Sequence, residues 1–351
     1  MLLFIIKRLF YGFWVIIGVT IVVFLIFHVL PGDPADAIAG RMRREEDRQR
    51  IRQEYNLDKP VLYQLILYFN DVSFLSFHEN TPQAQQKYRF TPLVPFGNKV
   101  MVWKAPYLRE SFQSHLPVTD IVLNDLKGTF WLSVAAMTFA TFFGIALGLV
   151  SALHQSRWLD HVLITTSVLG ISAPSFITAI VIQVFFGYYL SEWTGLPGHG
   201  SLFEKDANGV SQLFLKNLIL PAITLGIRPL AIIMQITRNS MIDVLSQDFI
   251  RTAKAKGAGQ WSIVFKHALK NALNPVITAV TGWLASLMAG AFFVEYIFNF
   301  HGLGYDTIEA VKNKDLPLVM GATIVVAIFF VFVNIFVDLL YALIDPRIKL
   351  Q

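Results

Sequence analysis

Six long apolar stretches limit what this chain can fold into more than any other feature of its sequence. A helix needs about 20 residues to cross the ~30 Å hydrocarbon core of a bilayer. Of the 351 residues, only 15% are charged, against about 25% in soluble proteins. We therefore expect an all-α polytopic membrane protein with six transmembrane helices. The predicted spans are residues 9–30, 129–153, 162–190, 218–237, 276–298 and 318–344.

The distribution of Lys and Arg between the short loops predicts the orientation of these spans. Short cytoplasmic loops carry an excess of basic residues. With the N-terminus inside, eleven Lys and Arg fall on the cytoplasmic side and four on the outer side. The segment 31–128 carries thirteen more, but loops this long cross a membrane largely regardless of charge. Both termini are therefore expected in the cytoplasm. Residues 1–30 form a retained first span, because their apolar run is longer than the core of a signal peptide.

Residues 31–128 are expected to form an extracytoplasmic loop region. Charges predict a surface helix over residues 41–55, and an Asp-Lys-Pro sequence at 58–60 opens a second helix. That second helix is expected on the membrane surface or against the spans, because apolar residues share one of its faces. They are Leu62, Leu65, Ile66 and Phe69. Between residues 72 and 117 the helical periodicity fails, and Gly97-Asn98 predicts a hairpin turn between 89–96 and 99–104.

A polar segment between the fourth and fifth predicted spans interrupts the apolar sequence. Residues 248–256 are rich in Ala, Arg and Lys and favour a short helix, and Gly257 can adopt the left-handed conformation that ends it. A second short helix is expected to run from there to Pro275. Together they form a compact cytoplasmic knob, which suits the transfer of force to a soluble partner. The sequence contains no Gly-Lys-Ser/Thr phosphate loop and no other nucleotide motif that we find.

Several short segments, taken in order, form a recognisable series along the chain. They are Lys7-Arg8, His28-Val29-Leu30-Pro31-Gly32-Asp33-Pro34-Ala35, Asn56-Leu57-Asp58-Lys59-Pro60, Trp158-Leu159-Asp160, Ser172-Ala173-Pro174-Ser175, Arg238-Asn239-Ser240-Met241, the polar segment 248–257, Gly302-Leu303-Gly304 and Asp345-Pro346-Arg347. This series resembles the oligopeptide, dipeptide and nickel group of ATP-binding-cassette (ABC) importer permeases over nearly the whole chain, and the first-subunit type fits best. It departs from the family in two places. Residues 77–107 look like an insertion, and Arg251 stands where the general importer motif has Glu, as is usual in this group.

The resemblance implies a type I ABC importer permease fold that forms one half of a translocation pathway. Within the family, such a subunit pairs with a second permease subunit, two cytoplasmic ABC ATPases that bind ATP and Mg, and an extracytoplasmic solute-binding protein. It implies a non-catalytic, multi-pass subunit of a bacterial cytoplasmic (inner) membrane. Residues 129–351 would be the permease core and 238–275 its cytoplasmic coupling loop.

Seven residues match the family's ATPase-coupling motif. They are Arg251, Thr252, Ala253, Lys254, Ala255, Lys256 and Gly257. Small residues at 253 and 255 would let the helix seat closely in a groove of an ATPase. The alternative is a basic inner loop held at lipid head groups, which would give the same excess of Lys and Arg.

Arg228 is the single basic residue inside a predicted span. It lies ten residues, or ~15 Å of helix, from Arg238 at the inner boundary, and hence near the middle of the membrane. A charge there costs at least ~2.5 kcal/mol on insertion scales, so Arg228 should face a cavity or a partner. Two interpretations remain open. It meets a solute carboxylate or gates the pathway, or it forms a structural ion pair with Glu295 or Asp338.

Small and polar residues of the fifth span are further pathway candidates. Gly282, Ser286 and Gly290 repeat every four residues, which indicates either close helix contact near the pathway or ordinary packing within the subunit. Glu295 lies near the outer end of the same span. A similar series in the second span, from Ala140 through Gly144 and Gly148 to Ala152, also indicates close helix packing.

Two polar residues of the sixth span, Asn334 and Asp338, share a helix face and are pathway candidates as well. For Asn334 an interhelical hydrogen bond is the preferred interpretation. Asp338 has a structural alternative, contact with Arg238 or the coupling loop. In the third span Pro174 predicts a kink, with nearby Ser hydroxyls satisfying the freed backbone.

The leading functional expectation is import of short peptides, and nickel, glutathione or another small solute is the alternative. The binding protein usually selects the solute, so the chain's own sequence does not specify it. A self-sufficient secondary transporter would need ion-binding acids within the membrane, and few are present. The sequence has no Cys, and its eight His are scattered without ligand spacing, so no metal site is predicted.

Overall fold

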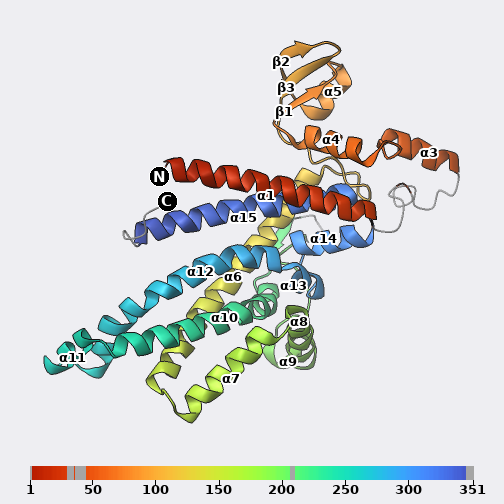
Figure 1. Cartoon of the computed structure of the whole chain (residues 1–351). Helices are drawn as coiled ribbons and strands as arrows, with labels where there is room; N and C mark the ends of the chain where they lie inside the picture. Colours follow the sequence, from red (N-terminus) through yellow and green to blue (C-terminus); the bar gives the residue numbers. More distant parts are fainter. Residues whose placement is uncertain (1, 30–34, 36–44, 206–209, 345–351) are drawn as a thin grey trace. The chain divides into compact units, whose positions relative to one another are not determined.

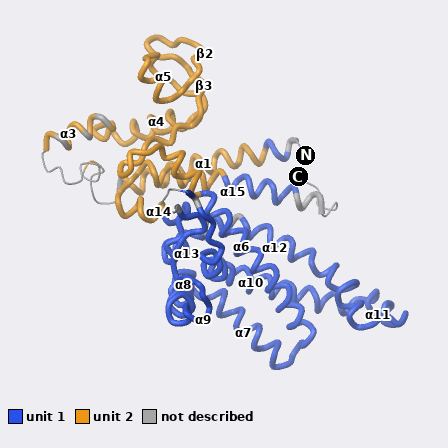
Figure 2. Tube along the Cα trace, turned by 180° about the vertical axis from the view of Figure 1, so that it is seen from behind, with its two compact units in different colours: residues 1–6, 126–305, 329–351 blue, residues 7–125, 306–328 orange. Residues whose placement is uncertain are grey.

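A computed structural model describes residues 2–29, 35, 45–205 and 210–344, which form mainly helices (Figure 1). The chain divides into two compact units (Figure 2). Unit 1 consists of residues 1–6, 126–305 and 329–351, and unit 2 of residues 7–125 and 306–328.

Unit 2 combines helices with a small antiparallel sheet. Its elements are α1 (Leu2–Val29), α3 (Glu45–Glu54), α4 (Val61–Val72), β1 (Leu75–His78), α5 (Pro82–Tyr88), β2 (Thr91–Phe96) and β3 (Lys99–Trp103), with one end each of α6 (Val118–Leu153), α14 (Leu303–Lys312) and α15 (Leu316–Ile344). The predicted charged helix is confirmed over 45–54, whereas 41–44 lies outside the described residues. The predicted second helix is α4.

The predicted hairpin is present and belongs to a larger sheet. Strands β2 and β3 pair antiparallel around Gly97, whose φ of 60° fits a tight turn, and Phe96 pairs with Lys99. A third strand, β1, pairs with the other edge of β3, which gives the order β1-β3-β2. Residues 77–107 therefore form most of an ordered sheet with one short helix, α5, beside it.

A buried apolar cluster joins α1, α4 and α15 within unit 2. Its six buried members are Phe24, Tyr68, Phe112, Leu316, Met320 and Ile324. Leu65 and Val72 of α4 pack against the same cluster. The expectation that α4 lies against the spans is therefore confirmed for one of its faces.

Buried charges connect α4 to the segment that follows the sheet. The Lys104 side chain is 2% exposed, and its Nζ donates a hydrogen bond to the carbonyl oxygen of Asp71. Arg109 Nε donates to Asp71 Oδ2 at 2.8 Å. Burial lowers the pKa of Lys104 to about 8, against the Coulomb attraction of Asp71, which raises it.

Unit 1 is almost entirely helical. Besides parts of α1, α6, α14 and α15, it contains α7 (Trp158–Ser172), α8 (Ser175–Val184), the π-helical η1 (Phe185–Tyr189), α9 (Ser191–Thr194), β4 (Phe203–Lys205), β5 (Ser211–Leu213), α10 (Lys216–Leu245), α11 (Asp248–Ala255), the π-helical η2 (Ser262–Leu269), α12 (Lys270–Gly290) and α13 (Phe292–Ile297).

Helix α10 packs closely against α6, through the predicted small residues. A Cβ added at Gly144 would lie 2.8 Å from the Ile233 side chain, and one at Gly148 would lie 2.6 Å from the Met234 carbonyl oxygen. Glycine is therefore required at both positions for the two helices to approach as they do. The small-residue series of the second span thus marks close packing within the chain.

Four helices among the described residues are long and apolar enough to cross a membrane: Phe4–Phe27, Val118–Leu153, Lys216–Leu245 and Leu316–Leu339. The pair formed by Trp158–Ser172 and Ser175–Tyr189 makes a fifth if it counts as one span. These match the first, second, fourth, sixth and third predicted spans, and the predicted fifth falls on α12 and α13. The polytopic helical character is confirmed, whereas the number six is not.

The third predicted span is not one continuous helix. Its two halves meet at 109°, at the position where Pro174 predicts a kink. Ala173 has an extended conformation, which a following proline favours. Thr178 Oγ1 donates to the Pro174 carbonyl oxygen at 3.3 Å, at the start of α8.

The prediction that a second short helix ends at Pro275 is wrong. The chain stays helical from η2 through Pro275 to Gly290. A proline removes one donor from the helix. That loss is outweighed because the flanking residues Ala272 and Val276 are each 1% exposed and bury their side chains in the unit 1 core.

Candidate coupling segment and translocation pathway

The short helix α11 is anchored to unit 1 by a single buried side chain. Ile250 is 0% exposed and packs in a cluster with residues of α6, α10, η2 and the start of α12. Of the seven residues predicted for coupling, six are exposed and Ala253 is half-buried. Gly257 follows with φ of 80°, which confirms the predicted left-handed stop. A Cβ at Gly257 would meet no atom within 4 Å, so only its conformation demands glycine.

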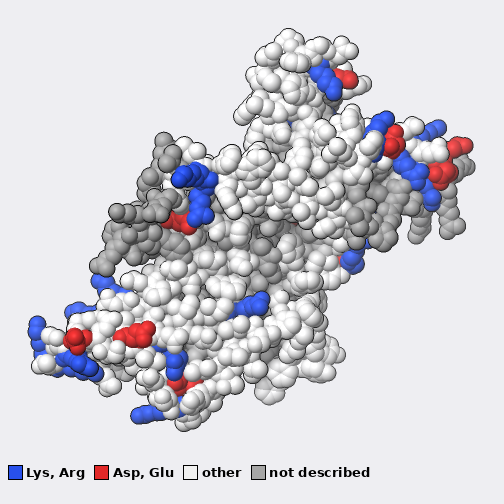
Figure 3. All heavy atoms as spheres, viewed as in Figure 1, with Lys and Arg blue, Asp and Glu red and all other residues white. Residues whose placement is uncertain are grey.

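Charges gather on the same end of unit 1, and aromatic side chains lie among them. Figure 3 shows basic side chains over α11, whereas most of the unit's visible surface carries no charge. Trp261 is 74% exposed and stacks on exposed Phe265, with ring centroids 5.6 Å apart. Phe249 is exposed as well. Sequence reasoning missed these three residues, although aromatic residues in a basic polar loop were a usable signal.

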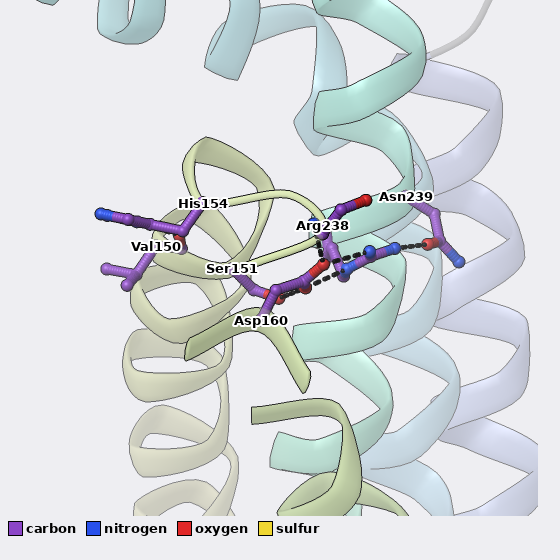
Figure 4. Close-up of polar contacts among 7 residues, drawn as sticks. Val150, Ser151, His154, Asp160, Arg238 and Asn239 are labelled. Atoms are coloured by element: carbon purple, nitrogen blue, oxygen red, sulfur yellow. Dashed lines mark hydrogen bonds and ion pairs between the residues drawn. The ribbon is translucent and has the colours of Figure 1, made fainter. Parts of the chain in front are cut away.

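An ion pair ties the turn between α6 and α7 to α10 (Figure 4). Arg238 donates from Nε to Asp160 Oδ1 and from Nη2 to Oδ2, both at 2.7 Å. Ser151 Oγ donates to Oδ1 at 2.5 Å, and the Ser156 backbone N–H donates to Oδ2 at 2.9 Å. Asp160 is 1% exposed, so these four donors stabilise a carboxylate that water does not reach. Both residues lie in segments that carry the family resemblance, but their pairing was not predicted.

A small cavity of about 140 Å³ brings two of the predicted pathway residues together. Arg228 of α10 and Ser286 of α12 both line it, with residues from the α7–α8 bend. Among the described residues, Arg228 has no hydrogen-bond or ion-pair partner. Arg228 thus lines this cavity, and among the described residues it forms no ion pair with Glu295 or Asp338.

Glu295 is engaged elsewhere, which explains why it does not meet Arg228. It is 0% exposed. Its Oε1 accepts a hydrogen bond from Thr129 Oγ1, and its Oε2 accepts one from the Gly304 backbone N–H, each at 2.7 Å. A Cβ at Gly302 would lie 2.6 Å from Thr129 Oγ1, so the Gly-Leu-Gly segment fits tightly around this carboxylate. Glu295 therefore anchors a loop in this structure.

One face of α12 is exposed among the described residues of unit 1. Thr278, Gly282 and Ser286 are exposed at successive four-residue steps, and a Cβ at Gly282 would meet no atom within 4 Å. Packing among the described residues therefore does not explain Gly282. Gly290 is the last residue of the helix.

The two candidates of α15 do not form the contacts expected of them. Asn334 Nδ2 donates to the Phe330 carbonyl oxygen at 2.7 Å, within its own helix. The predicted interhelical bond is thus wrong for the described part of the chain. Asp338 is half-buried, and its alternative partner Arg238 is bound to Asp160 instead. Among the described residues, no group of three or more His, Asp or Glu is placed to hold a metal ion.

Comparison with known proteins covers both parts of the chain. Residues 144–350 match the family described as "Binding-protein-dependent transport system inner membrane component", and residues 1–135 match "Binding-prot-dependent transport system membrane comp, N-term". A dipeptide transport system permease protein of Alkalihalophilus pseudofirmus is 35% identical, over 99% of this chain and all of that protein.

Two relatives from Escherichia coli are similarly close. A probable D,D-dipeptide transport system permease protein is 34% identical over 95% of this chain and 94% of its own length. A glutathione transport system permease protein is 32% identical over 99% of both chains. A solved amino acid ABC transporter is 17% identical, with a TM-score of 0.43 over 66% of this chain and 95% of that one. From the family matches and these relatives, we conclude that the chain belongs to the binding-protein-dependent transport system inner membrane component family, as an ABC importer permease of the oligopeptide, dipeptide and nickel group.

Proposed function

We propose that this chain is the permease subunit of an ATP-driven importer of short peptides. It forms half of the translocation pathway and couples that pathway to cytoplasmic ATPases. The peptide class is supported by relatives whose names specify dipeptides, D,D-dipeptides and glutathione, which is itself a small peptide. The observation that carries the proposal is the exposed, basic helix α11, held to the rest of unit 1 by buried Ile250.

Coupling requires that a push on α11 reaches the helices around the pathway. Ile250 belongs to a buried cluster with side chains of α6, α10, η2 and α12, so a displacement of α11 is passed to these elements through the cluster. The contact residues proposed for the ATPase are Arg251, Thr252, Ala253, Lys254, Ala255, Lys256 and Gly257. Exposed Trp261 and Phe265 add apolar area beside them.

The pathway is proposed to run along the uncovered face of α12 and past Arg228. A guanidinium that lines a cavity and has no partner among the described residues suits the terminal carboxylate of a peptide, which it can bind in a bidentate manner. Gly282, Ser286 and Gly290 would line the pathway, together with Asn334 and Asp338 of α15. Glu295 is left out of this proposal, because its carboxylate holds the Gly302–Gly304 segment.

The proposed topology has six transmembrane helices in a type I ABC importer permease fold, with both termini in the cytoplasm of a bacterium. Residues 1–30 form the N-terminus and first span, residues 31–128 lie outside, and residues 129–351 form the permease core with its coupling loop at 238–275. The excess of Lys and Arg on the proposed inner side supports this arrangement. The chain is not an enzyme by itself. ATP and Mg bind to two partner ATPases, and a second permease subunit and a solute-binding protein complete the assembly.

Nickel or another small solute on the same architecture is the alternative within the family, and a self-sufficient secondary transporter is the alternative of another class. Co-expression with the candidate partners, followed by purification and reconstitution into vesicles, separates them. We expect the ATPases to co-purify with the chain. ATP supplied to the ATPases should drive uptake of a labelled dipeptide, and ionophores should not abolish this uptake. Uptake of Ni²⁺ without dipeptide uptake would favour the nickel alternative. Ionophore-sensitive dipeptide uptake by the chain without ATPases would reject the proposal.

A further inference from the structure

Helix α4 turns its polar face inward and its apolar face outward. Gln64, Tyr68 and Asp71 are its buried residues. On the opposite side Leu62 is 69% exposed and Ile66 is 56% exposed, with Val61 and Tyr63 exposed beside them. The predicted single apolar face is therefore divided, because Leu65 packs inward on the core of unit 2 whereas Leu62 and Ile66 do not.

The protein itself satisfies the buried polar groups of α4. Gln64 Nε2 donates to the carbonyl oxygens of Leu57 and Lys59, at 3.2 and 2.8 Å. The Asp71 carboxylate accepts a hydrogen bond from Arg109. These contacts fix the rotation of the helix about its axis. The hydrogen bonds of the opposite face therefore hold Leu62 and Ile66 in their outward position.

The buried side of α4 also fixes where the helix lies along the spans. It packs on Phe24, five residues before the end of α1, and on Leu316 and Met320 in the first turns of α15. At 1.5 Å per residue Phe24, Leu316 and Met320 lie within about 8 Å of the two helix ends, and Ile324 of the same cluster lies about 12 Å from the start of α15. That depth matches the boundary between lipid head groups and acyl chains, where amphipathic helices bury their apolar face by about 5–10 Å.

We propose that α4 is an interfacial helix whose Leu62 and Ile66 face is immersed in lipid, at the membrane surface where α1 ends and α15 begins. The residues from Val61 to Asn70 include no charged side chain, whereas a protein docking surface usually carries a polar rim. Tyr63 places a phenol on the same exposed side, and tyrosine is enriched at this depth of a membrane. The inference rests on the membrane location of the chain and is independent of the solute carried.

The chain contains no cysteine, so single-cysteine variants can be labelled directly. Leu62→Cys and Ile66→Cys are labelled with an environment-sensitive fluorophore in the assembled transporter, reconstituted in lipid vesicles. Gln86→Cys on the exposed side of α5 is the control within the same unit. We expect lipids with a nitroxide near the head group to quench the labels at 62 and 66 at least about twofold more than the label at 86. Aqueous iodide should quench in the opposite order.

Two results would overturn the inference. In the first, the labels at 62 and 66 are as accessible to iodide as the label at 86. In the second, the labels are shielded from iodide only when the binding protein or the partner permease is present, and the nitroxide lipids do not quench them. Peptide uptake is measured with the same vesicles. Normal uptake with exposed labels would reject the interfacial helix and leave the proposed function intact.

Discussion

Arg238 holds Asp160 with two hydrogen bonds of 2.7 Å, although 78 residues separate them in the sequence. Because Ser151 and Ser156 donate to the same carboxylate, the pair locks the turn between α6 and α7 onto α10. This turn lies at the end of unit 1 that also contains the proposed coupling helix α11. The lock therefore gives that end of the unit a fixed geometry.

Breaking the lock should destabilise the chain without touching the proposed ATPase contact. Asp160→Asn leaves Arg238 partly buried with a neutral partner, and the loss of such a buried pair costs about 3 kcal/mol. The loss of stability is measured as the decrease in the free energy of unfolding of the purified chain in detergent. Asp243→Asn, which removes an exposed carboxylate from the same helix as Arg238, is the matched control and should change little. Equal stability of the two variants would contradict the assigned role.

Arg228→Ala should reduce uptake of dipeptides with a free C-terminal carboxylate by about tenfold or more, and uptake of C-terminally amidated dipeptides much less. The reason is that Arg228 lines a cavity and has no hydrogen-bond or ion-pair partner in the described part of the chain. The measurement is ATP-dependent uptake of both ligands in reconstituted vesicles. Arg157→Ala removes an exposed basic residue outside the cavity and is the control. A similar loss for both ligands would mean that the guanidinium does not meet the carboxylate.

Lys104 makes the stability of unit 2 depend on pH. Its pKa is lowered to about 8, mainly by burial, so between pH 8 and pH 10 the unfolded chain binds more protons at this residue than the folded chain. Stability should therefore rise with pH in this range, by at most about 1.4 kcal/mol per pH unit. Above pH 10 Tyr88 and Tyr107, whose pKa values burial raises, act in the opposite sense. Thermal unfolding between pH 7 and pH 10 should show the rise in the wild type and not in Lys104→Met.

The sheet of residues 77–107 is proposed to contact the solute-binding protein or the partner permease. In this segment Phe96 and Trp103 are exposed, whereas Phe90 is buried and Tyr88 and Tyr107 are half-buried. Phe96→Ser should therefore weaken binding-protein affinity or permease pairing by about tenfold, the loss typical of one exposed aromatic anchor. Gln86→Ser on α5 is the surface control. Unchanged affinity and unchanged pairing in Phe96→Ser would remove this role from the exposed face.

Local signals allowed much of the fold to be predicted. Apolar length located the spans, and Gly257 takes the left-handed conformation that its position after a short helix predicted. The hairpin around Gly97-Asn98 could also be predicted, because the residues that form its turn are adjacent in the sequence. Strand β1 was missed, since its pairing with β3 depends on a contact between distant segments.

Features that depend on tertiary packing were not predictable in the same way. The sequence indicates that Arg228 faces a cavity or a partner, but not which of the two. Its candidate partner Glu295 binds Thr129 and Gly304 in the structure. Pro275 was expected to end a helix, but burial of the residues around it outweighs its missing donor. The pairing of Asp160 with Arg238 could not be read from spacing, because neither residue is near the other along the chain.

The central claim, that α11 transmits ATPase motion to the pathway, is tested most directly by comparing two glycines. Gly257 has φ of 80°, whereas Gly259 has no positive φ, and a Cβ would fit in open space at both. Valine is thus strained only at position 257, where it must distort the end of α11. In vesicles with all partner subunits, Gly257→Val should retain ATP hydrolysis but lower the number of peptides imported per ATP by about tenfold or more, and Gly259→Val should resemble the wild type. Wild-type import per ATP in Gly257→Val, with the variant assembled normally, would contradict the account.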